Sequence, residues 1–311
     1  MMLNQKVIVL VVFFITQSIC SQQEAAFSLY MFNHQSINPA YVGAQTYTQI
    51  TAVNKLQWTG IYGSPETQAI SFGHQFQNKN LGIGFSSVVD KLGPTQNTST
   101  AIDVAYHLKL NDNNLKLGFG IKLSGRSYLL DSSMISLFDS SDPIFAQQPQ
   151  RFFPNIGAGF YLHNQKFYAG FGLPYLLEDE ELAYKRNYYL IFGGLFNLNK
   201  TIELKPSFLF QKTQTVPLAY DTSVLFVVNS KYWIGPQFRA NFNSLLPNQK
   251  NAGYYGAIAG VHIGDKITLG YSYQGPTGNQ NIGITNSSHE LLLRFQLSPK
   301  NIGVLRSPRL F

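Results

Sequence analysis

The chain has 311 residues, of which 44% are apolar, 14% are aromatic and only 13% are charged. The charged fraction is about half that of an ordinary soluble domain, and the apolar content excludes a disordered chain. Beyond the N-terminus no apolar run reaches the roughly 18 residues of a spanning helix. The net charge of +7 comes from scattered basic residues, so a nucleic-acid-binding patch is not indicated. The composition favours a β-rich chain that carries few charges on a large surface.

The N-terminus (residues 1–21) has the pattern of a secretory signal peptide. Lys6 precedes the apolar run Val7–Ile15, and small residues follow around Cys20 and Ser21. The run is too short to span a bilayer, so we expect cleavage near Cys20 or Ser21. A lipoprotein anchor at Cys20 is the alternative, although the residue before it is not small. Because the chain has one cysteine, we expect no disulfide and no thiolate site in the mature protein.

The next segment, residues 22–44, is rich in turn formers and side-chain amides, yet it contains Tyr30, Phe32 and Tyr41. Leaving three rings exposed would forgo burial that stabilises by about 1.5–3 kcal/mol each. We therefore expect this segment to pack against the domain that follows, with Asn38-Pro39 making the turn into it. A simple ordered leader is the alternative.

From residue 45 to residue 297 apolar side chains recur with the period of two that is typical of strands. Ile102, Val104 and Tyr106, for example, alternate with small or charged residues such as Asp103. The pattern predicts fourteen strands, at 46–58, 66–76, 80–90, 99–110, 114–130, 155–163, 166–174, 187–198, 201–212, 217–229, 231–241, 252–263, 266–274 and 287–297.

The predicted connections alternate between short and long. The short turns are rich in Asn, Asp and Gly, which accept a positive φ, and they lie at 77–80, 111–114, 163–165, 198–200, 229–231 and 264–266. The longer connections lie at 59–65, 91–98, 131–154, 175–186, 242–251 and 275–286, and the link at 213–216 is a short exception. Short turns at one end, long loops at the other and an even strand number are typical of a transmembrane barrel. A soluble β-sandwich would carry polar side chains where these strands carry Leu, Phe and Tyr.

We therefore predict an all-β fold: a transmembrane antiparallel β-barrel of about 14 strands over 45–297, with short periplasmic turns and longer extracellular loops. Residues 22–44 would then lie in its periplasmic mouth or lumen, and residues 298–311 would form a basic periplasmic tail. This organisation predicts an outer-membrane protein in contact with outer-membrane lipid.

Isolated charges in the strands fall on the face opposite the apolar residues; examples are Asp103, Lys122, Glu203 and Asp221. A charge on the lipid face costs about 2–4 kcal/mol at the midplane, so we expect these side chains in the lumen. There they would either line a pore or pair with a plug.

Motifs of enzymatic chemistry are missing from the sequence. It contains no G-x-S-x-G elbow, no H-E-x-x-H, no Walker loop and no G-x-G-x-x-G. The six histidines are dispersed, and the acidic run Glu178–Glu181 lacks the alternate spacing of a calcium loop. We expect no enzymatic activity, no cofactor and no metal. A hydrolase embedded in the barrel wall, which would need a Ser and a His that converge in space, is a third alternative.

The longest predicted loop, Asp131–Pro154, exceeds the length of ordinary connections, and such loops are usually functional or disordered. It carries apolar side chains among Asp and Ser residues, and these must fold over the barrel mouth or bind a partner. The candidate docking residues are Leu137, Phe138, Phe145, Phe152 and Phe153.

Several short motifs stand in order along the chain: Tyr30-Met31-Phe32-Asn33, Asn38-Pro39-Ala40-Tyr41, Gln57-Trp58 with Pro65, Asp90-Lys91-Leu92-Gly93-Pro94, and Ser307-Pro308-Arg309. In these motifs, over residues 22–311, the sequence resembles the PorP/SprF-like outer-membrane proteins of the type IX secretion system of Bacteroidota. It departs from them in the segment Met31–Ala40, where relatives often carry an apolar residue near Gln35.

The resemblance implies a non-enzymatic barrel that assists the secretion or surface attachment of a large exported protein, such as a gliding adhesin. The partner would be the C-terminal sorting domain of that protein, and periplasmic components of the secretion or gliding machinery would be further partners. The motif residues would be structural or partner-binding. The alternative function is an outer-membrane pore or a transporter of hydrophobic compounds.

Overall fold

A computed structural model describes residues 26–76, 79–110, 114–131, 151–179, 184–214, 216–241, 253–276 and 287–297. Three short helical turns come first, η1 (Tyr30–Phe32), α2 (His34–Ile37) and η2 (Pro39–Tyr41). The strands are β1 (Thr48–Gln57), β2 (Glu66–Phe76), β3 (Leu81–Leu92), β4 (Thr95–Lys109), β5 (Lys116–Leu130), β6 (Arg151–His163), β7 (Phe167–Leu173), β8 (Asn187–Gly194), β9 (Phe196–Asn197), β10 (Ile202–Thr213), β11 (Val216–Val228), β12 (Tyr232–Asn241), β13 (Gly253–Ile263), β14 (Ile267–Pro276) and β15 (Ser288–Leu297). No helix within these ranges has the length and apolarity needed to cross a membrane.

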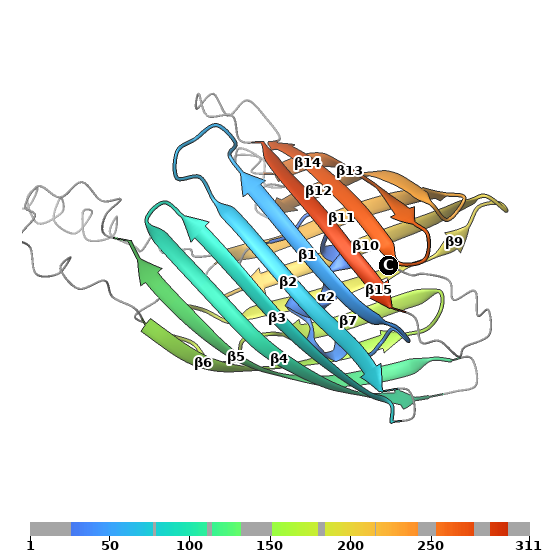
Figure 1. Cartoon of the computed structure of the whole chain (residues 1–311), viewed down its shortest axis with the longest axis horizontal. Coiled ribbons are helices and arrows are strands. Elements are labelled where there is room, and N and C mark those ends of the chain that lie inside the picture. The colour runs from blue at the N-terminus through green and yellow to red at the C-terminus, as the bar shows by residue number, and fades with distance from the viewer. Residues whose placement is uncertain are drawn as a thin grey trace, which may run out of the picture.

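The strands form one antiparallel sheet that closes on itself. β15 pairs with β1 along its whole length, from Leu297 opposite Thr48 to Ser288 opposite Gln57, and the two strands lie side by side in Figure 1. β8 and β9 both pair with β10, so β9 continues β8 after an interruption at Leu195. The fifteen assigned strands therefore make fourteen spans. The predicted closed barrel of about 14 antiparallel strands is confirmed.

The two faces of the wall differ as the period of two predicts. On β4 and β5 the outward side chains Ile102 and Ile121 are 56% and 61% exposed, whereas the inward side chains Asp103 and Lys122 are almost fully buried. Successive residues of a strand point to opposite faces, so every strand presents one apolar row to the outside. This arrangement gives the apolar outer band that a membrane barrel needs.

Two of the predicted connections were wrong. Residues 91–98 are not a long loop, because β3 runs to Leu92, β4 begins at Thr95, and Gly93 turns the chain with φ 54°. The loop predicted at 131–154 is shorter, because β6 begins at Arg151. In both places the strand pairing continues where the alternation of apolar and polar residues stops. The residues become polar over 95–98, whereas over 151–154 two phenylalanines stand next to each other.

The early start of β6 places two of the candidate docking residues in a strand and not in a loop. Phe152 and Phe153 belong to β6, and Phe152 is 72% exposed. Leu137, Phe138 and Phe145 lie outside the described residues.

Candidate functional site

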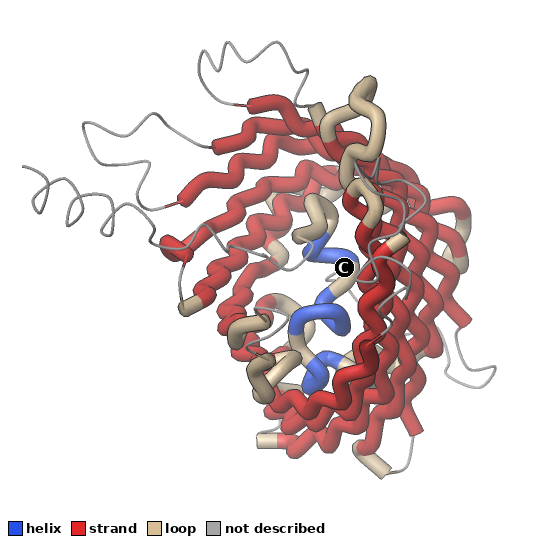
Figure 2. Tube along the Cα trace, turned by 90° about the vertical axis from the view of Figure 1, so that its left-hand side faces the viewer, coloured by secondary structure: helices blue, strands red, loops and turns tan. Residues whose placement is uncertain are grey.

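Residues 26–44, here called the plug, lie inside the barrel. Figure 2 shows the three helical turns enclosed by the ring of strands. Both plug motifs are buried, Tyr30–Asn33 and Asn38–Tyr41 alike. The plug therefore occupies the space through which a solute would have to pass.

The plug runs along the lumen from one end toward the other. At its start, the backbone N–H groups of Ser28 and Leu29 donate to the carboxylate of Glu290, which lies near the long-loop end of β15. At its end, the carbonyl of Val42 lies 2.7 Å from Nε2 of His107, near the short-turn end of β4. The plug thus begins in the long-loop half of the lumen and runs to the short-turn end, where β1 begins.

Charged side chains of the wall hold the plug by its backbone. Glu290 accepts from Ser28 N at 2.6 Å and from Leu29 N at 2.8 Å. On the same strand, Arg294 donates to the carbonyl of Phe32. Hydrogen bonds to charged groups contribute about 1.5–3 kcal/mol each, more than neutral ones. Buried wall charges therefore serve as anchors for main-chain groups that have no sheet to pair with.

A second anchor joins the middle of the plug to β4 and β5. Lys122 and Asp103 form an ion pair of 3.3 Å, with both side chains almost fully buried. Nε2 of Gln35 donates to Asp103 at 3.0 Å, and Nζ of Lys122 donates to the carbonyl of Gln35 at 3.3 Å. Gln35 of the plug is thus part of the ion-pair network. Of the two roles open to these charges, pairing with a plug is the one observed.

Glycines let the plug backbone lie directly against the wall. A Cβ on Gly82 of β3 would lie 2.2 Å from the carbonyl oxygen of Val42, and a Cβ on Gly120 of β5 would lie 2.2 Å from the backbone nitrogen of Ala40. Neither distance is sterically possible for a real side chain, so these positions require glycine for space. The small residues on the inward face of β3 and β5 follow from this close approach.

The rest of the plug packs against aromatic and aliphatic side chains of the wall. The ring of Phe32 lies 4.8 Å from that of Trp233, and Nδ1 of His34 lies 3.0 Å from the hydroxyl of Tyr161. Burial lowers the pKa of His34 to about 3 and raises the pKa of Tyr30, so both side chains are uncharged at neutral pH. These contacts give the plug a hydrophobic core of its own inside the barrel.

The motifs that follow the plug meet at the long-loop end. Gln57 N donates to the carbonyl of Pro65 at 2.9 Å, and Gly93 N donates to the carbonyl of Gly63 at 2.9 Å. The carboxylate of Asp90 accepts from the hydroxyl of Thr67 at 2.5 Å. The β1–β2 loop and the β3–β4 hairpin are therefore hydrogen-bonded to each other at the long-loop end of the barrel.

The remaining motif residues fall in different places. Trp58 follows β1 with φ 51° and is partly exposed. Lys91 is exposed at the end of β3, and Pro94 shares the β3–β4 hairpin with Gly93. Ser307, Pro308 and Arg309 lie outside the described residues.

Above the plug, at the long-loop end, lies a cavity of about 240 Å³. Phe27 and Ile37 of the plug are among its lining residues, together with residues of β3, β4, β5 and β8. Arg126 stacks on Tyr175 at 3.6 Å and on Tyr184 at 4.6 Å from the ring centroids, and its Nε donates to Ser99 at 3.1 Å. The long-loop end therefore presents a polar, aromatic depression that plug residues help to line.

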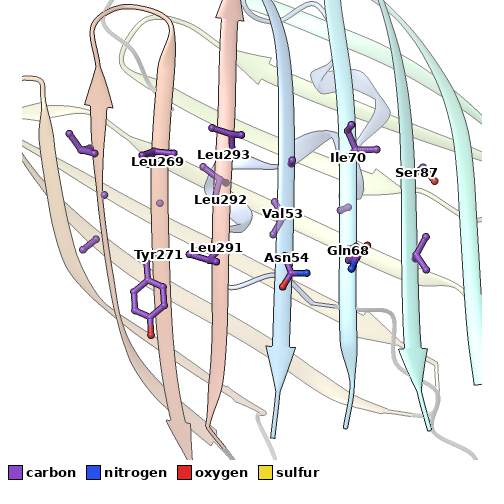
Figure 3. Close-up of a pocket in the computed structure, with 17 residues that line it drawn as sticks. Val53, Asn54, Gln68, Ile70, Ser87, Leu269, Tyr271, Leu291, Leu292 and Leu293 are labelled. Carbon is purple, nitrogen blue, oxygen red and sulfur yellow. The ribbon is translucent and has the colours of Figure 1, made fainter. Parts of the chain in front are cut away.

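A larger groove, of about 760 Å³, lies on the wall around the junction of β15 and β1. Figure 3 shows side chains from neighbouring strands around it, including Leu269, Leu293 and Ile70. These three are outward-facing and partly or well exposed. The groove belongs to the apolar outer band, so we assign it to lipid contact and not to chemistry.

Within the described ranges no three His, Cys, Asp or Glu residues gather closely enough to hold a metal ion. The groups that do gather are hydrogen-bonding and aromatic, so the arrangement is suited to binding.

Sequence reasoning found the plug motifs and the inward charges Asp103, Lys122 and Asp221, but it missed Glu290 and Arg294 as anchors. The signal was present, because both fall in the inward register of β15 beside the buried Leu292. The register shows that a charged side chain points inward, but it does not show which group that side chain binds. Here Glu290 and Arg294 bind the plug backbone.

The solved structures that resemble this chain are outer-membrane barrels. The Ralstonia pickettii toluene transporter TbuX is 10% identical, with a TM-score of 0.50, over 89% of this chain and 95% of that one. The Acinetobacter baumannii outer membrane protein Omp33 is 10% identical, with a TM-score of 0.47, over 82% of this chain and 100% of that one. A Pseudomonas aeruginosa FadL homologue is 14% identical, with a TM-score of 0.47, over 87% and 94%. At such identities the likeness concerns the fold alone.

Comparison at the level of sequence is more specific. The curated proteins contain no match to this chain. Residues 19–295 match the family described as "Type IX secretion system membrane protein PorP/SprF". The match covers the plug, the motifs of the β1–β2 loop and the β3–β4 hairpin, and the fourteen spans up to the last two residues of β15. The chain therefore belongs to the PorP/SprF family of type IX secretion system membrane proteins.

Proposed function

We propose that this barrel is a docking protein of the type IX secretion route, which assists the secretion or surface attachment of a large exported protein such as a gliding adhesin. The long-loop end is extracellular and binds the C-terminal sorting domain of that protein. The short-turn end faces the periplasm and the machinery there. In this role the protein performs no covalent chemistry.

The observation that carries the proposal is the plug. Its buried backbone is fixed by Glu290, Arg294 and the Asp103–Lys122 pair, and it lies against Gly82 and Gly120 of the wall without intervening side chains. A lumen filled in this way is poorly suited to a passive pore or to a transporter of hydrophobic compounds. It is well suited to a rigid scaffold whose two ends bind other proteins.

The long-loop end offers a surface of the kind that a partner domain binds. The exposed ring of Phe152 and the tyrosine-lined cavity around Arg126 lie at this end. Tyr and Arg are enriched in the energetically dominant positions of protein interfaces. Plug residues help to line the cavity, which suits contacts to a partner that remains outside.

Deleting residues 135–150 is expected to leave the barrel assembled and to lower the surface display of the client. The strands β5 and β6 on either side keep their pairing outside the deletion, so folding does not depend on the loop. The measurement is quantitative surface proteomics of the strain that carries the variant, with heat-dependent gel mobility as the check on assembly.

A shorter deletion, of residues 244–249 in another long connection, is the control. Display that falls only with the 135–150 deletion supports docking at that loop. Normal display in the 135–150 variant together with loss in the control would move the docking surface to 242–251. Normal display in both variants, and in a strain that lacks the protein, would contradict the proposed function.

A further inference from the structure

The short-turn end of the barrel carries a ring of lysines. Every one of the six short connections contains a lysine or is flanked by one at a strand end. These residues, here called the collar, are Lys79, Lys109, Lys116, Lys166, Lys200, Lys231 and Lys266. The same connections contain only two acidic residues, Asp112 and Asp265. The strands enclose the lumen, so the collar surrounds its mouth.

The opposite rim shows no such bias. The exposed and partly exposed charged residues described at the long-loop ends of the strands and in the long connections include Glu66, Asp90, Lys91, Asp131, Arg151, Glu178, Asp179, Lys185, Arg186 and Lys212. Positive and negative charges are there in similar number, and Glu178 lies within 4 Å of both Lys185 and Arg186. Charge of one sign is therefore a property of the short-turn end and not of the whole surface.

Five of the seven collar lysines stand in the register of the lumen. Lys109 stands two residues after the buried His107, and Lys116 stands two residues before the inward-facing Gly118. Lys166, Lys231 and Lys266 likewise stand two residues before the buried Tyr168, Trp233 and Thr268. Lys79 and Lys200 stand two residues before the outward-facing Leu81 and Ile202. Lys109 and Lys116 lie within strands, so their register directs them to the lumen, where a soluble partner can meet them.

Two lysines of the collar lie side by side. Lys109 and Lys116 are directly opposite each other across β4 and β5, which concentrates positive charge at this point of the mouth.

We propose that the collar binds an acidic surface of a periplasmic protein. The proposal concerns the end of the barrel opposite the client, and it relies on the proposed function only for which side is periplasmic. Recognition is by charge complementarity, which accelerates encounter and fixes orientation and which weakens as salt rises.

The test measures binding of poly-L-glutamate to the purified full-length protein in a neutral detergent at several salt concentrations. The collar variant replaces the exposed Lys79, Lys166, Lys200 and Lys266 with Gln. The matched control makes the same change of net charge at the other rim, by replacing Lys91, Arg151, Lys185 and Arg186 with Gln. A third variant replaces the four collar lysines with Arg.

We expect the collar variant to bind roughly tenfold more weakly, with a shallower dependence on salt. The long-loop control should stay within about twofold of the unaltered protein, and the Arg variant should retain binding, because the effect depends on charge. Heat-dependent gel mobility shows that each variant is folded.

A second measurement distinguishes binding of an acidic protein surface from binding of anionic lipid headgroups. It measures the phosphatidylglycerol retained by the same variants in nanodiscs. The proposal is overturned if the collar variant binds poly-L-glutamate as tightly as the unaltered protein, or if the long-loop control loses as much. It is also overturned if the collar variant loses phosphatidylglycerol while its affinity for poly-L-glutamate is unchanged, because the collar would then be a lipid site.

Discussion

Replacing both Gly82 and Gly120 with alanine is expected to force the plug away from the wall. Each new Cβ would lie 2.2 Å from a backbone atom of the plug, of Val42 in one case and of Ala40 in the other. Backbone cannot move aside as a flexible side chain does, and overpacking of this kind costs about 1–3 kcal/mol per site. Hydrogen-exchange mass spectrometry should therefore show faster exchange of the amides of Asn38, Tyr41 and Ala44.

Gly275 provides the matched control, because a Cβ there would have no neighbour nearer than 3.7 Å and its φ is not in the left-handed region. The change of Gly275 to alanine should leave the exchange of the plug amides unaltered. Equal protection of the plug in the Gly82/Gly120 double variant and in the unaltered protein would mean that the plug does not lie where these contacts require.

Replacing Asp103 with asparagine is expected to lower the free energy of unfolding by about 3–5 kcal/mol, because it leaves a buried charge without its counter-charge. Lys122 is 1% exposed and pairs with Asp103 at 3.3 Å, and Gln35 of the plug also donates to this carboxylate. The measurement is equilibrium unfolding in urea in phospholipid vesicles, followed by gel mobility.

Two comparisons make this result specific. The double change of Asp103 to Asn and Lys122 to Met removes both charges and should recover most of the loss. The change of Glu178 to Gln affects a partly exposed pair, with 3.8 Å between Glu178 and Lys185, and should cost less than about 1 kcal/mol. If the single Asp103 variant were as stable as the Glu178 variant, the ion pair would not be an anchor of the plug.

The barrel was predictable because its pattern is local. Alternation such as Ile102, Asp103, Val104 sets the two faces of a strand, and the short turns set which strands are neighbours. The same rule misjudged residues 91–98 and 151–154. Beyond the apolar band a strand faces water on both sides, so its pairing persists without an alternation that the sequence can show.

The plug was predictable only in part. The aromatic residues Tyr30, Phe32 and Tyr41 indicated that the segment is buried, and the register placed Asp103 and Lys122 in the lumen. Which wall group meets which plug group depends on contacts between residues far apart in the chain, such as Ser28 with Glu290. The close approach at Gly120 likewise depends on the position of the plug, which no local pattern encodes.

We infer that this family member is a closed docking barrel and not a pore. Single-channel recording of the purified protein in planar lipid bilayers tests it most directly, with a variant that lacks residues 26–44 as the positive control. We predict no sustained open state for the full protein and steady ion conduction for the variant, because the plug is held inside the lumen by its anchors on β4, β5 and β15. A steady conductance of the full protein equal to that of the plug-deleted variant would contradict the claim.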